Sequence, residues 1–263
     1  MFTKEYLKQQ IKDMGITSED TVVIHTSYKS IGEVEGGIDG FIDAFKEYLS
    51  EGLFIIPTHT WGVVTKENPI YDVRSAIPCI GAVPKVAAFR KDGIRSLHPT
   101  HSVWVTGKKA KEFILGEELA TTPAPLGGCW SRLDSLGAKI LLIGVGNNSN
   151  TFIHAVDEKA NLDDRLAQTS WDVTIIDHDG RKITHSYRNH GKTGSENFDN
   201  YEKMFIEKGV QTFGKLGESQ VKICDAKKCS EVLLKLFSKV RENLCMEPGQ
   251  ISEELYKDIN VDE

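Results

Sequence analysis

Short apolar runs alternate with amphipathic segments along the first 160 residues. The apolar runs are bounded by polar or turn-forming residues and cover residues 20–25, 53–57, 103–106 and 139–145. Runs of this length predict buried β-strands, of which residues 139–145 form the strongest. Apolar residues at helical spacing predict helices over residues 4–14 and 38–49. Further helices are expected over residues 83–89 and 108–114 and from about Thr151 onward.

The rest of the chain adds a hairpin and a second helical part. Apolar and polar positions alternate on both sides of the turn sequence DHDG, which predicts a β-hairpin over residues 173–188. The pattern then predicts a helix over residues 197–208, a strand over 219–224 and an amphipathic helix over 229–242. Residues 62–80 lack periodicity and are expected to form a long functional loop. The polar tail from about residue 247 is expected to fray.

No repeat, low-complexity tract or linker separates these elements. We therefore predict a single domain over residues 1–263, of the α/β class, with a central mixed β-sheet flanked by helices. The chain contains 40% hydrophobic and 27% charged residues, which is ordinary for a globular protein. No apolar run approaches the length of a membrane span, and residues 1–10 do not resemble a secretory signal. We expect a cytoplasmic protein that does not bind membranes.

Charge, cysteine content and missing motifs disfavour several classes of protein. The formal net charge of -6 disfavours nucleic acid as a partner and is compatible with a cationic small-molecule substrate. The five cysteines are odd in number, and no second Cys/His pair lies near Cys224 and Cys229, so reduced thiols are expected and a zinc site is not. The sequence contains neither GxSxG nor HExxH, which disfavours a serine hydrolase and a zinc protease. No metal is expected.

Polar clusters follow three of the predicted strands. His25, Thr26 and Ser27 follow the first strand, residues 58–62 follow the second, and the sequence GNNSN follows the strongest. Ligands of open α/β sheets sit beyond the carboxyl ends of strands, so these clusters are expected to converge. Gly36 and Gly37 open a helix, where backbone N–H groups either bind an anion or form an ordinary turn.

Two histidine-containing segments are candidates for chemistry. His154 lies three residues before Asp157 and four before Glu158, which places the three side chains on one helix face. The group is either a helix ion pair or a histidine base held by a carboxylate. His98 and His101 flank a proline and are expected to be structural or substrate-lining.

For the remaining histidines and the tryptophans, structural or pocket-lining roles are expected rather than catalytic ones. His25 is also compatible with a hydrogen-bonded residue at a strand end. Solvent-exposed or structural roles are expected for His59, His178 and His185. Core or pocket-wall positions are expected for Trp61, Trp104, Trp130 and Trp171.

Several segments, taken in order, resemble the aminoglycoside 3-N-acetyltransferase family. They are HTSYKSIGEVEGG, IPTHTW, RSLHPTHSV, WSRLDSLGAKILLIGVG and NSNTFIHAVDE, with thinner similarity after residue 165. The resemblance implies the antibiotic N-acetyltransferase type of α/β fold, distinct from the GNAT fold, with acetyl-CoA as donor and a primary amine as acceptor. It implies that His154 is the catalytic histidine. Asp157 stands where the family usually has Glu, which leaves open whether Asp157 or Glu158 orients the histidine.

The same resemblance places a group of residues on the CoA side of the site: His25, Thr26, Ser27, Gly36, Gly37, Arg95 and Ser102. The implied chemistry is proton removal by His154 from an amine that attacks the thioester, with loop N–H groups or the hydroxyls of Thr26 and Ser27 as candidate donors to the oxyanion. The implied acceptor is the 3-amino group of an aminoglycoside.

Because aminoglycosides carry several ammonium groups, we expect an acidic lip from Asp157, Glu158, Asp163, Asp164 and Asp72, although the last three are equally compatible with solvated surface positions. Two alternatives stay open: the same transfer to a different small-molecule amine, and a non-catalytic acyl-CoA-binding protein. A homodimer is the commonest assembly for such an enzyme and is a possible oligomeric state here.

Overall fold

The centre of the molecule is a seven-stranded mixed sheet. The computed structural model describes residues 1–192, 194–241, 244–245 and 247–261. The strand order is β4-β5-β2-β1-β6-β10-β9. β1 pairs in parallel with β2 and β6, whereas every other pairing in this sheet is antiparallel. The strands are β1 (Thr21–Thr26), β2 (Leu53–Pro57), β4 (Ile94–Arg95), β5 (Val103–Gly107), β6 (Lys139–Ile143), β9 (Gln211–Leu216) and β10 (Ser219–Asp225).

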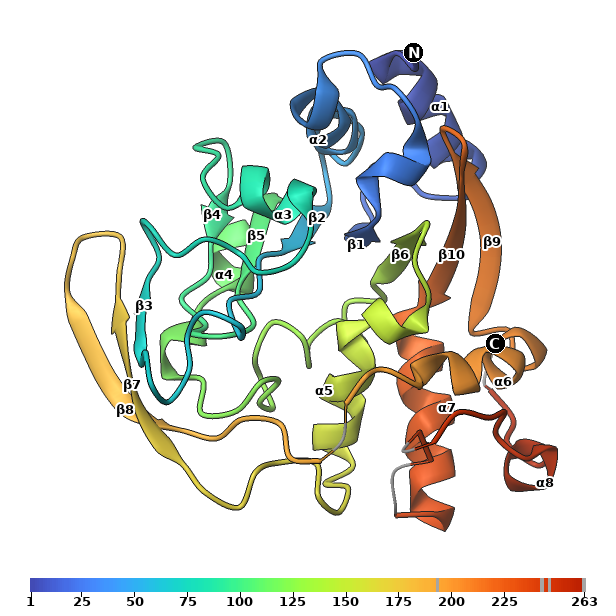
Figure 1. Cartoon of the computed structure of the whole chain (residues 1–263). Helices are drawn as coiled ribbons and strands as arrows, with labels where there is room; N and C mark the ends of the chain where they lie inside the picture. Colours follow the sequence, from blue (N-terminus) through green and yellow to red (C-terminus); the bar gives the residue numbers. More distant parts are fainter. Residues whose placement is uncertain (193, 242–243, 246, 262–263) are drawn as a thin grey trace.

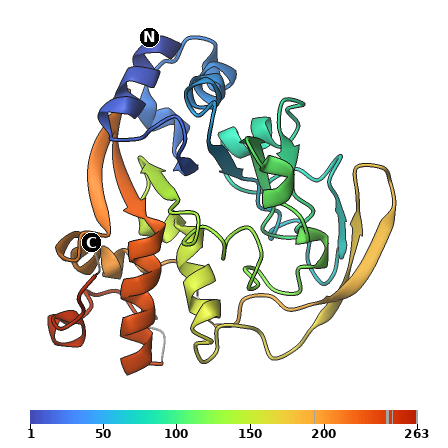
Figure 2. The same ribbon diagram turned by 180° about the vertical axis from the view of Figure 1, so that it is seen from behind.

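Helices cover both faces of this sheet, because its central strands are apolar on both faces (Figures 1 and 2). Alternate residues of a strand point to opposite faces, so Val22 and Ile24 enter one hydrophobic core and Val23 enters the other. The first core is completed by α1 (Lys4–Asp13), α2 (Gly37–Tyr48) and α3 (Ala82–Ala87). The second is completed by α4 (Ala110–Phe113), α5 (Thr151–Lys159) and α7 (Ala226–Lys239). The predicted α/β class with a mixed sheet flanked by helices is confirmed.

A second, three-stranded sheet stands to one side of the molecule (Figure 1). The predicted hairpin is present as β7 (Trp171–Ile176) and β8 (Lys182–Tyr187). β3 (Ile70–Asp72) adds to it in parallel with β7. Residues 62–80, predicted to form a long functional loop, thus contain a short strand, because three residues of this segment find pairing partners about a hundred residues away. Local periodicity carries no information about such a partner.

The C-terminal third also departs from the sequence prediction. The expected helix over 197–208 is a 3₁₀ turn, Phe198–Tyr201, followed by α6 (Glu202–Glu207), and β9 follows unpredicted. α7 begins at residue 226 rather than 229, since Asp225 accepts a hydrogen bond from the Lys228 N–H at 2.9 Å and caps the helix. α7 ends at Lys239, and residue 242 of the predicted helix lies outside the described residues.

The tail from about residue 247 does not simply fray. It forms α8 (Glu253–Tyr256) and buries Ile251, Tyr256 and Ile259 against the core around α7. These three buried side chains are diluted among charged residues, so the average polarity of the segment concealed them. Across the described ranges, no helix combines the length and apolarity needed to cross a bilayer.

Candidate active site

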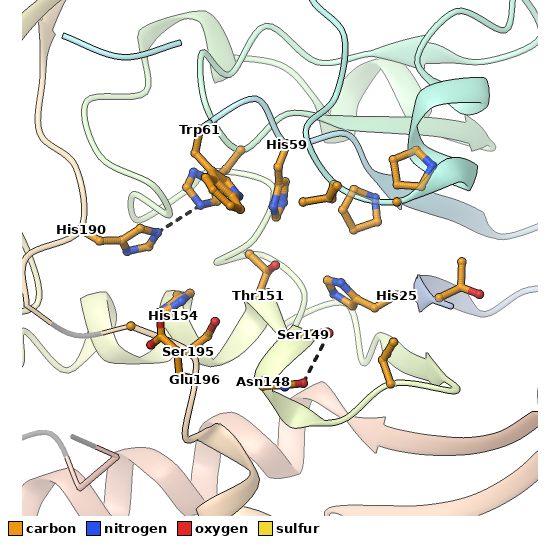
Figure 3. Close-up of a pocket in the computed structure, with 18 of the residues that line it drawn as sticks. His25, His59, Trp61, Asn148, Ser149, Thr151, His154, His190, Ser195 and Glu196 are labelled. Carbon is orange, nitrogen blue, oxygen red and sulfur yellow. Dashed lines mark hydrogen bonds between the residues drawn. The ribbon is translucent and has the colours of Figure 1, made fainter. Parts of the chain in front are cut away.

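A cavity of about 660 Å³ lies at the carboxyl ends of the three parallel strands. Its wall includes His25 and Thr26 from the end of β1, His59 from the segment after β2, and Thr151 and His154 from α5, which follows β6 (Figure 3). Parallel strands direct their carboxyl ends to the same edge, so the polar clusters predicted from the sequence do converge. The strand order thus assembles one site from segments far apart in the chain.

Five histidines line this cavity: His25, His59, His101, His154 and His190. Burial lowers the pKa of His25 to about 3 and holds the pKa of the other four well below the ordinary value. The rings also contact one another, with centroids 4.7 Å apart for His59 and His101 and 4.4 Å apart for His154 and His190. These five imidazoles of the cavity wall are therefore neutral at physiological pH.

His154 is held at the start of α5. The Asn150 side chain accepts a hydrogen bond from the Phe152 N–H and caps the helix, which places His154 in its first turn with 7% of its surface exposed. The ring Nδ1 is buried without a hydrogen-bond partner among the described residues, and the Oδ2 of Asp157 lies 3.7 Å away. Nδ1 thus faces the carboxylate one turn further along the helix.

The two carboxylates of α5 have different surroundings. Asp157 is 2% exposed, and burial raises its pKa to about 7 despite the Arg165 guanidinium nearby. Glu158 accepts hydrogen bonds from the Thr122 hydroxyl at 2.7 Å, the Ala124 N–H at 2.9 Å and Arg165 at 3.2 Å. The oxygens of Glu158 are therefore occupied away from His154, and Asp157 is the carboxylate that faces the imidazole.

Arg165 connects this pair with the rest of the histidine cluster. It is 2% exposed, its Nε donates to the His154 carbonyl at 3.3 Å, and its Nη1 donates to Nδ1 of His190. A guanidinium can only donate, so the proton of the neutral His190 ring must sit on Nε2. That proton points to Nε2 of His101 at 3.1 Å, which leaves the His101 proton on Nδ1, 2.8 Å from the Thr100 hydroxyl. One arginine thus fixes the tautomers of two histidines.

The residues predicted for the CoA side divide into two groups. His25 and Thr26 line the cavity, and the Thr26 hydroxyl is buried without a partner among the described residues. Ser27, Gly36 and Gly37 are not part of the cavity wall. The Ser27 N–H donates to the Ile143 carbonyl, and the Gly37 N–H donates to the Val34 carbonyl. Their predicted contact with CoA stays a prediction, and it would have to lie outside the cavity.

Arg95 and Ser102 are also absent from the cavity wall and have internal partners. Arg95 is 2% exposed and donates to the carbonyls of Ala76 and Thr58, at 2.6 and 3.0 Å. The Ser102 hydroxyl donates to the same Thr58 carbonyl at 2.8 Å. These hydrogen bonds connect residue 76 of the long segment to residue 58, directly after β2. They give no support to a direct contact of either side chain with CoA.

The expected acidic lip is not formed. Asp157 is buried, the side chain of Glu158 is 6% exposed and turned toward Thr122 and Ala124, and Asp72 pairs with Arg74 at 2.8 Å. Asp163 and Asp164 are exposed, 4.0 Å from Arg241 and 3.9 Å from Lys192 respectively. None of the five is among the described residues that form the wall.

Sequence reasoning missed two of the histidines in the wall. The sequence predicts a structural or exposed role for His59, yet this residue is 4% exposed and lines the cavity; its position directly after a buried strand is the available signal. His190 follows the hairpin and has no local signal, because its neighbours come from α5 and from the segment after β4. His178 donates to the Arg95 carbonyl and His185 to the Glu118 carbonyl, which fits the structural roles expected for them.

His98 and three of the four tryptophans follow the predictions, whereas Trp171 is half-buried and does not line the cavity. His98 is fully buried and accepts from the N–H groups of Thr100 and His101. Trp104 and Trp130 are buried, whereas Trp61 is 52% exposed on the cavity wall. Among the described residues, no group of three or more His, Cys, Asp or Glu side chains could hold a metal ion.

The fold and the cavity define an α/β enzyme with a buried histidine–carboxylate pair at the carboxyl edge of its parallel strands. A sequence profile of the aminoglycoside 3-N-acetyltransferase family matches residues 23–238. The chain belongs to this family of acyltransferases.

Relatives and solved structures agree with this assignment. Aminoglycoside N(3)-acetyltransferase IV from Salmonella is 25% identical over 218 residues, covering 82% of this chain and 80% of the relative. The SPbeta prophage-derived aminoglycoside N(3')-acetyltransferase-like protein YokD of Bacillus subtilis is 26% identical, covering 59% of this chain and 64% of that one.

Two solved structures share the fold. A histidine-to-alanine variant of aminoglycoside acetyltransferase AAC(3)-IVa in complex with a gentamicin superimposes with a TM-score of 0.74 at 21% identity, over 91% of this chain and 89% of that chain. AAC-IIIb with CoASH superimposes with a TM-score of 0.78 at 17% identity, over 92% and 98%.

Proposed function

We propose that this protein transfers the acetyl group of acetyl-CoA to a primary amine of a small molecule, with His154 as general base. The observation that carries the proposal is the neutral His154 ring on the cavity wall, with its buried Nδ1 facing Asp157 at 3.7 Å. An amine is protonated at neutral pH and must lose a proton to attack a thioester. A neutral imidazole is the form that accepts one.

Asp157 has the second role. With its proton on Nδ1 toward Asp157, the His154 ring presents Nε2 to the acceptor amine. Proton transfer then produces an imidazolium, which the Asp157 carboxylate stabilises. The amine nitrogen forms a bond to the acetyl carbon, the thioester C–S bond breaks, and the CoA thiolate takes up a proton. No acyl-enzyme is needed, because the thioester is already activated and both substrates are held together.

Acetyl-CoA as donor is supported by family membership and by the relative whose structure contains CoASH. The buried Thr26 hydroxyl, which lacks a partner among the described residues, is a candidate donor to the oxyanion of the tetrahedral intermediate. The names of the relatives make the 3-amino group of an aminoglycoside the first acceptor to test, and another small-molecule amine is the alternative.

The test is the variant His154→Ala, with release of CoA followed by a thiol reagent across a panel of primary amines that includes aminoglycosides. We expect kcat to fall by about 10²- to 10⁴-fold while acetyl-CoA binding stays within about twofold of the wild type. His178→Ala is the matched control, because His178 is exposed on the hairpin turn. An unchanged kcat in His154→Ala would refute the assignment. Binding of acetyl-CoA without turnover of any amine would instead support the non-catalytic alternative.

A further inference from the structure

Two of the five wall histidines have rings without a hydrogen bond. Both ring nitrogens of His101 and of His190 are bonded, and His154 faces a carboxylate. In His25 and His59, Nε2 is buried without a partner, and Nδ1 takes part in no hydrogen bond among the described residues. A neutral imidazole always carries one N–H, so each of these two rings holds an unused donor. Buried polar groups are nearly always paired, which makes an unused donor on a cavity wall a candidate for contact with a ligand.

Both unused imidazole donors lie on the face of the central sheet that carries His154. Trp130 belongs to the hydrophobic core that α5 completes, and its ring centroid lies 6.0 Å from that of His25 and 5.4 Å from that of His59. The hydroxyl of Thr26 leaves β1 on the opposite face, because successive residues of a strand point to opposite sides. A ligand atom next to His154 therefore lies on the side of the two imidazoles.

His59 and His154 are the two ends of an arc of imidazoles around the cavity. Ring centroids lie 4.7 Å apart for His59 and His101, 5.0 Å apart for His101 and His190, and 4.4 Å apart for His190 and His154. Figure 3 shows His59 on one wall and His154 on α5 opposite, with His190 between them at one side. His25 lies apart from this arc, at the end of β1. A group bound inside the arc thus faces His154 from one side and His59 from the other.

The surroundings of the two ends divide the chemistry between them. His154 has the Asp157 carboxylate 3.7 Å from Nδ1, so an imidazolium formed there is stabilised. The His59 ring packs against Trp130 and His101, and no carboxylate of the described chain pairs with it. Burial holds the pKa of His59 well below the ordinary value, so the ring stays neutral and keeps its N–H. A neutral imidazole of this kind acts as a hydrogen-bond donor to a polarised carbonyl group and not as a base.

We propose that His59 is a second catalytic residue, whose ring N–H donates a hydrogen bond to the carbonyl oxygen of the acetyl thioester. This role rests on the acetyl transfer proposed above. As the amine nitrogen bonds to the acetyl carbon, the π electrons of the carbonyl group move to the oxygen, and His154 takes the amine proton. The N–H of His59 stabilises this oxyanion and keeps its proton throughout. When the electron pair returns to carbon, the C–S bond breaks, CoA leaves as a thiolate, and the proton held by His154 passes to it.

The test compares two variants of His59. His59→Phe keeps an aromatic ring against Trp130 and removes both nitrogens, whereas the amide of His59→Gln can still donate. We expect kcat of His59→Phe to fall by about 10²- to 10³-fold, while KM for the amine and Kd for acetyl-CoA change by less than about threefold. His59→Gln should recover about tenfold or more of the lost kcat. His178→Phe, the same substitution at an exposed histidine outside the cavity, is the matched control.

The pH profile separates a donor from a base. Because His59 stays neutral, we expect kcat of His59→Phe to be lowered by the same factor at every pH, whereas loss of a base would change the shape of the profile. Equal defects in the phenylalanine and glutamine variants would overturn the role, since they would show that the shape of the ring matters and its N–H does not. An unchanged kcat in His59→Phe would overturn it as well.

Infrared spectroscopy supplies a readout that does not depend on turnover. Acetyl-CoA labelled with a heavy isotope at the carbonyl carbon is bound to each protein without an amine. We expect the C=O stretch at a lower frequency in the wild type and in His178→Phe than in His59→Phe, because a hydrogen bond weakens the C=O bond. The same frequency in all three proteins would overturn the role of His59.

Failure of the proposed function gives different results. A wild type that does not bind acetyl-CoA refutes the acetyl transfer and the role of His59 together. A wild type that binds acetyl-CoA but acetylates no amine refutes the transfer alone, and the infrared comparison then still decides whether His59 contacts the thioester.

Discussion

Two buried carboxyl groups of this protein have the same raised pKa in very different surroundings. Burial raises the pKa of Asp157 and that of Glu117 to about 7. Asp157 lies 3.7 Å from a cavity-lining imidazole and 4.0 Å from a guanidinium. One oxygen of Glu117 accepts the Cys129 N–H at 2.8 Å, and the other has no partner among the described residues. A perturbed pKa therefore does not identify a functional group by itself; the neighbours of the group decide what its charge can do.

The most direct test of the difference between Asp157 and Glu117 is to replace each carboxyl group in turn by its amide. We expect Asp157→Asn to lower kcat by about 10²- to 10⁴-fold, because the imidazolium of His154 loses its counter-charge. The wild-type kcat at saturating substrates should rise with pH through about 7, since the pKa of Asp157 places its ionisation in that range. The variant should lack this rise. Glu117→Gln should keep both kcat and its pH profile, and a loss of the rise in Glu117→Gln would place the titrating group elsewhere.

Removal of the cation beside Asp157 tests how much Arg165 contributes to the stability of the buried carboxylates. Arg165→Met leaves Asp157 and Glu158 without their guanidinium, and we expect the free energy of unfolding to fall by about 3–5 kcal/mol, as when one partner of a buried pair is removed. Chemical denaturation at pH 7 measures the loss. Arg74→Met, at an exposed pair, should change stability by less than about 1 kcal/mol. Equal losses in the two variants would show that Arg165 is not the hub of the cluster.

Glu117 offers a prediction about stability alone. Its pKa is raised from 4.5 to about 7, so the folded state binds the proton more tightly than the unfolded state. The contribution of Glu117 to the free energy of unfolding is then most favourable below pH 4.5 and is lost as the pH rises to about 7. The loss is on the order of 3 kcal/mol at about 1.4 kcal/mol per pH unit. The stability of the wild type relative to Glu117→Gln should fall accordingly between about pH 5 and pH 8, measured by thermal or urea unfolding. A constant difference would show that Glu117 stays ionised throughout.

The smallest expected effect on turnover comes from the hydrogen bonds that set the tautomers of His190 and His101. His190→Leu removes the acceptor for Arg165 and the donor to His101, and we expect kcat/KM to fall by about tenfold. Glutamine can both accept and donate, so His190→Gln should recover most of the loss. Equal defects in the leucine and glutamine variants would indicate that the ring acts by its shape rather than by its hydrogen bonds.

The sequence is informative where chemistry and periodicity are local. The buried strands that carry His25, His59 and the α5 segment can be recognised from apolar runs, and the spacing of His154 and Asp157 follows from the helix. The resemblance to the family correctly indicates the fold type. What could not be predicted depends on distant partners: β3 joins β7 across about a hundred residues, and His190 joins His154 and His101 only in three dimensions.

The choice between Asp157 and Glu158 also needed the structure. Both fall on the same helix face, and only the positions of Thr122, Ala124 and Arg165 show that Glu158 is occupied elsewhere. The expectation of an acidic lip was wrong for the same reason. A sequence reveals that carboxylates are present but not toward which neighbour they turn.

The place of β10 in the sheet has a consequence for biosynthesis. β6 lies between β1, made long before it, and β10, which comes from residues 219–225. A chain still emerging from the ribosome therefore carries the complete His154 helix while the edge of β6 that β10 will cover is still open. Unpaired edges of apolar strands template aggregation. A nascent or truncated chain that ends before residue 219 would thus depend on chaperones, and the last strand made, β10, is the one that covers the open edge of β6.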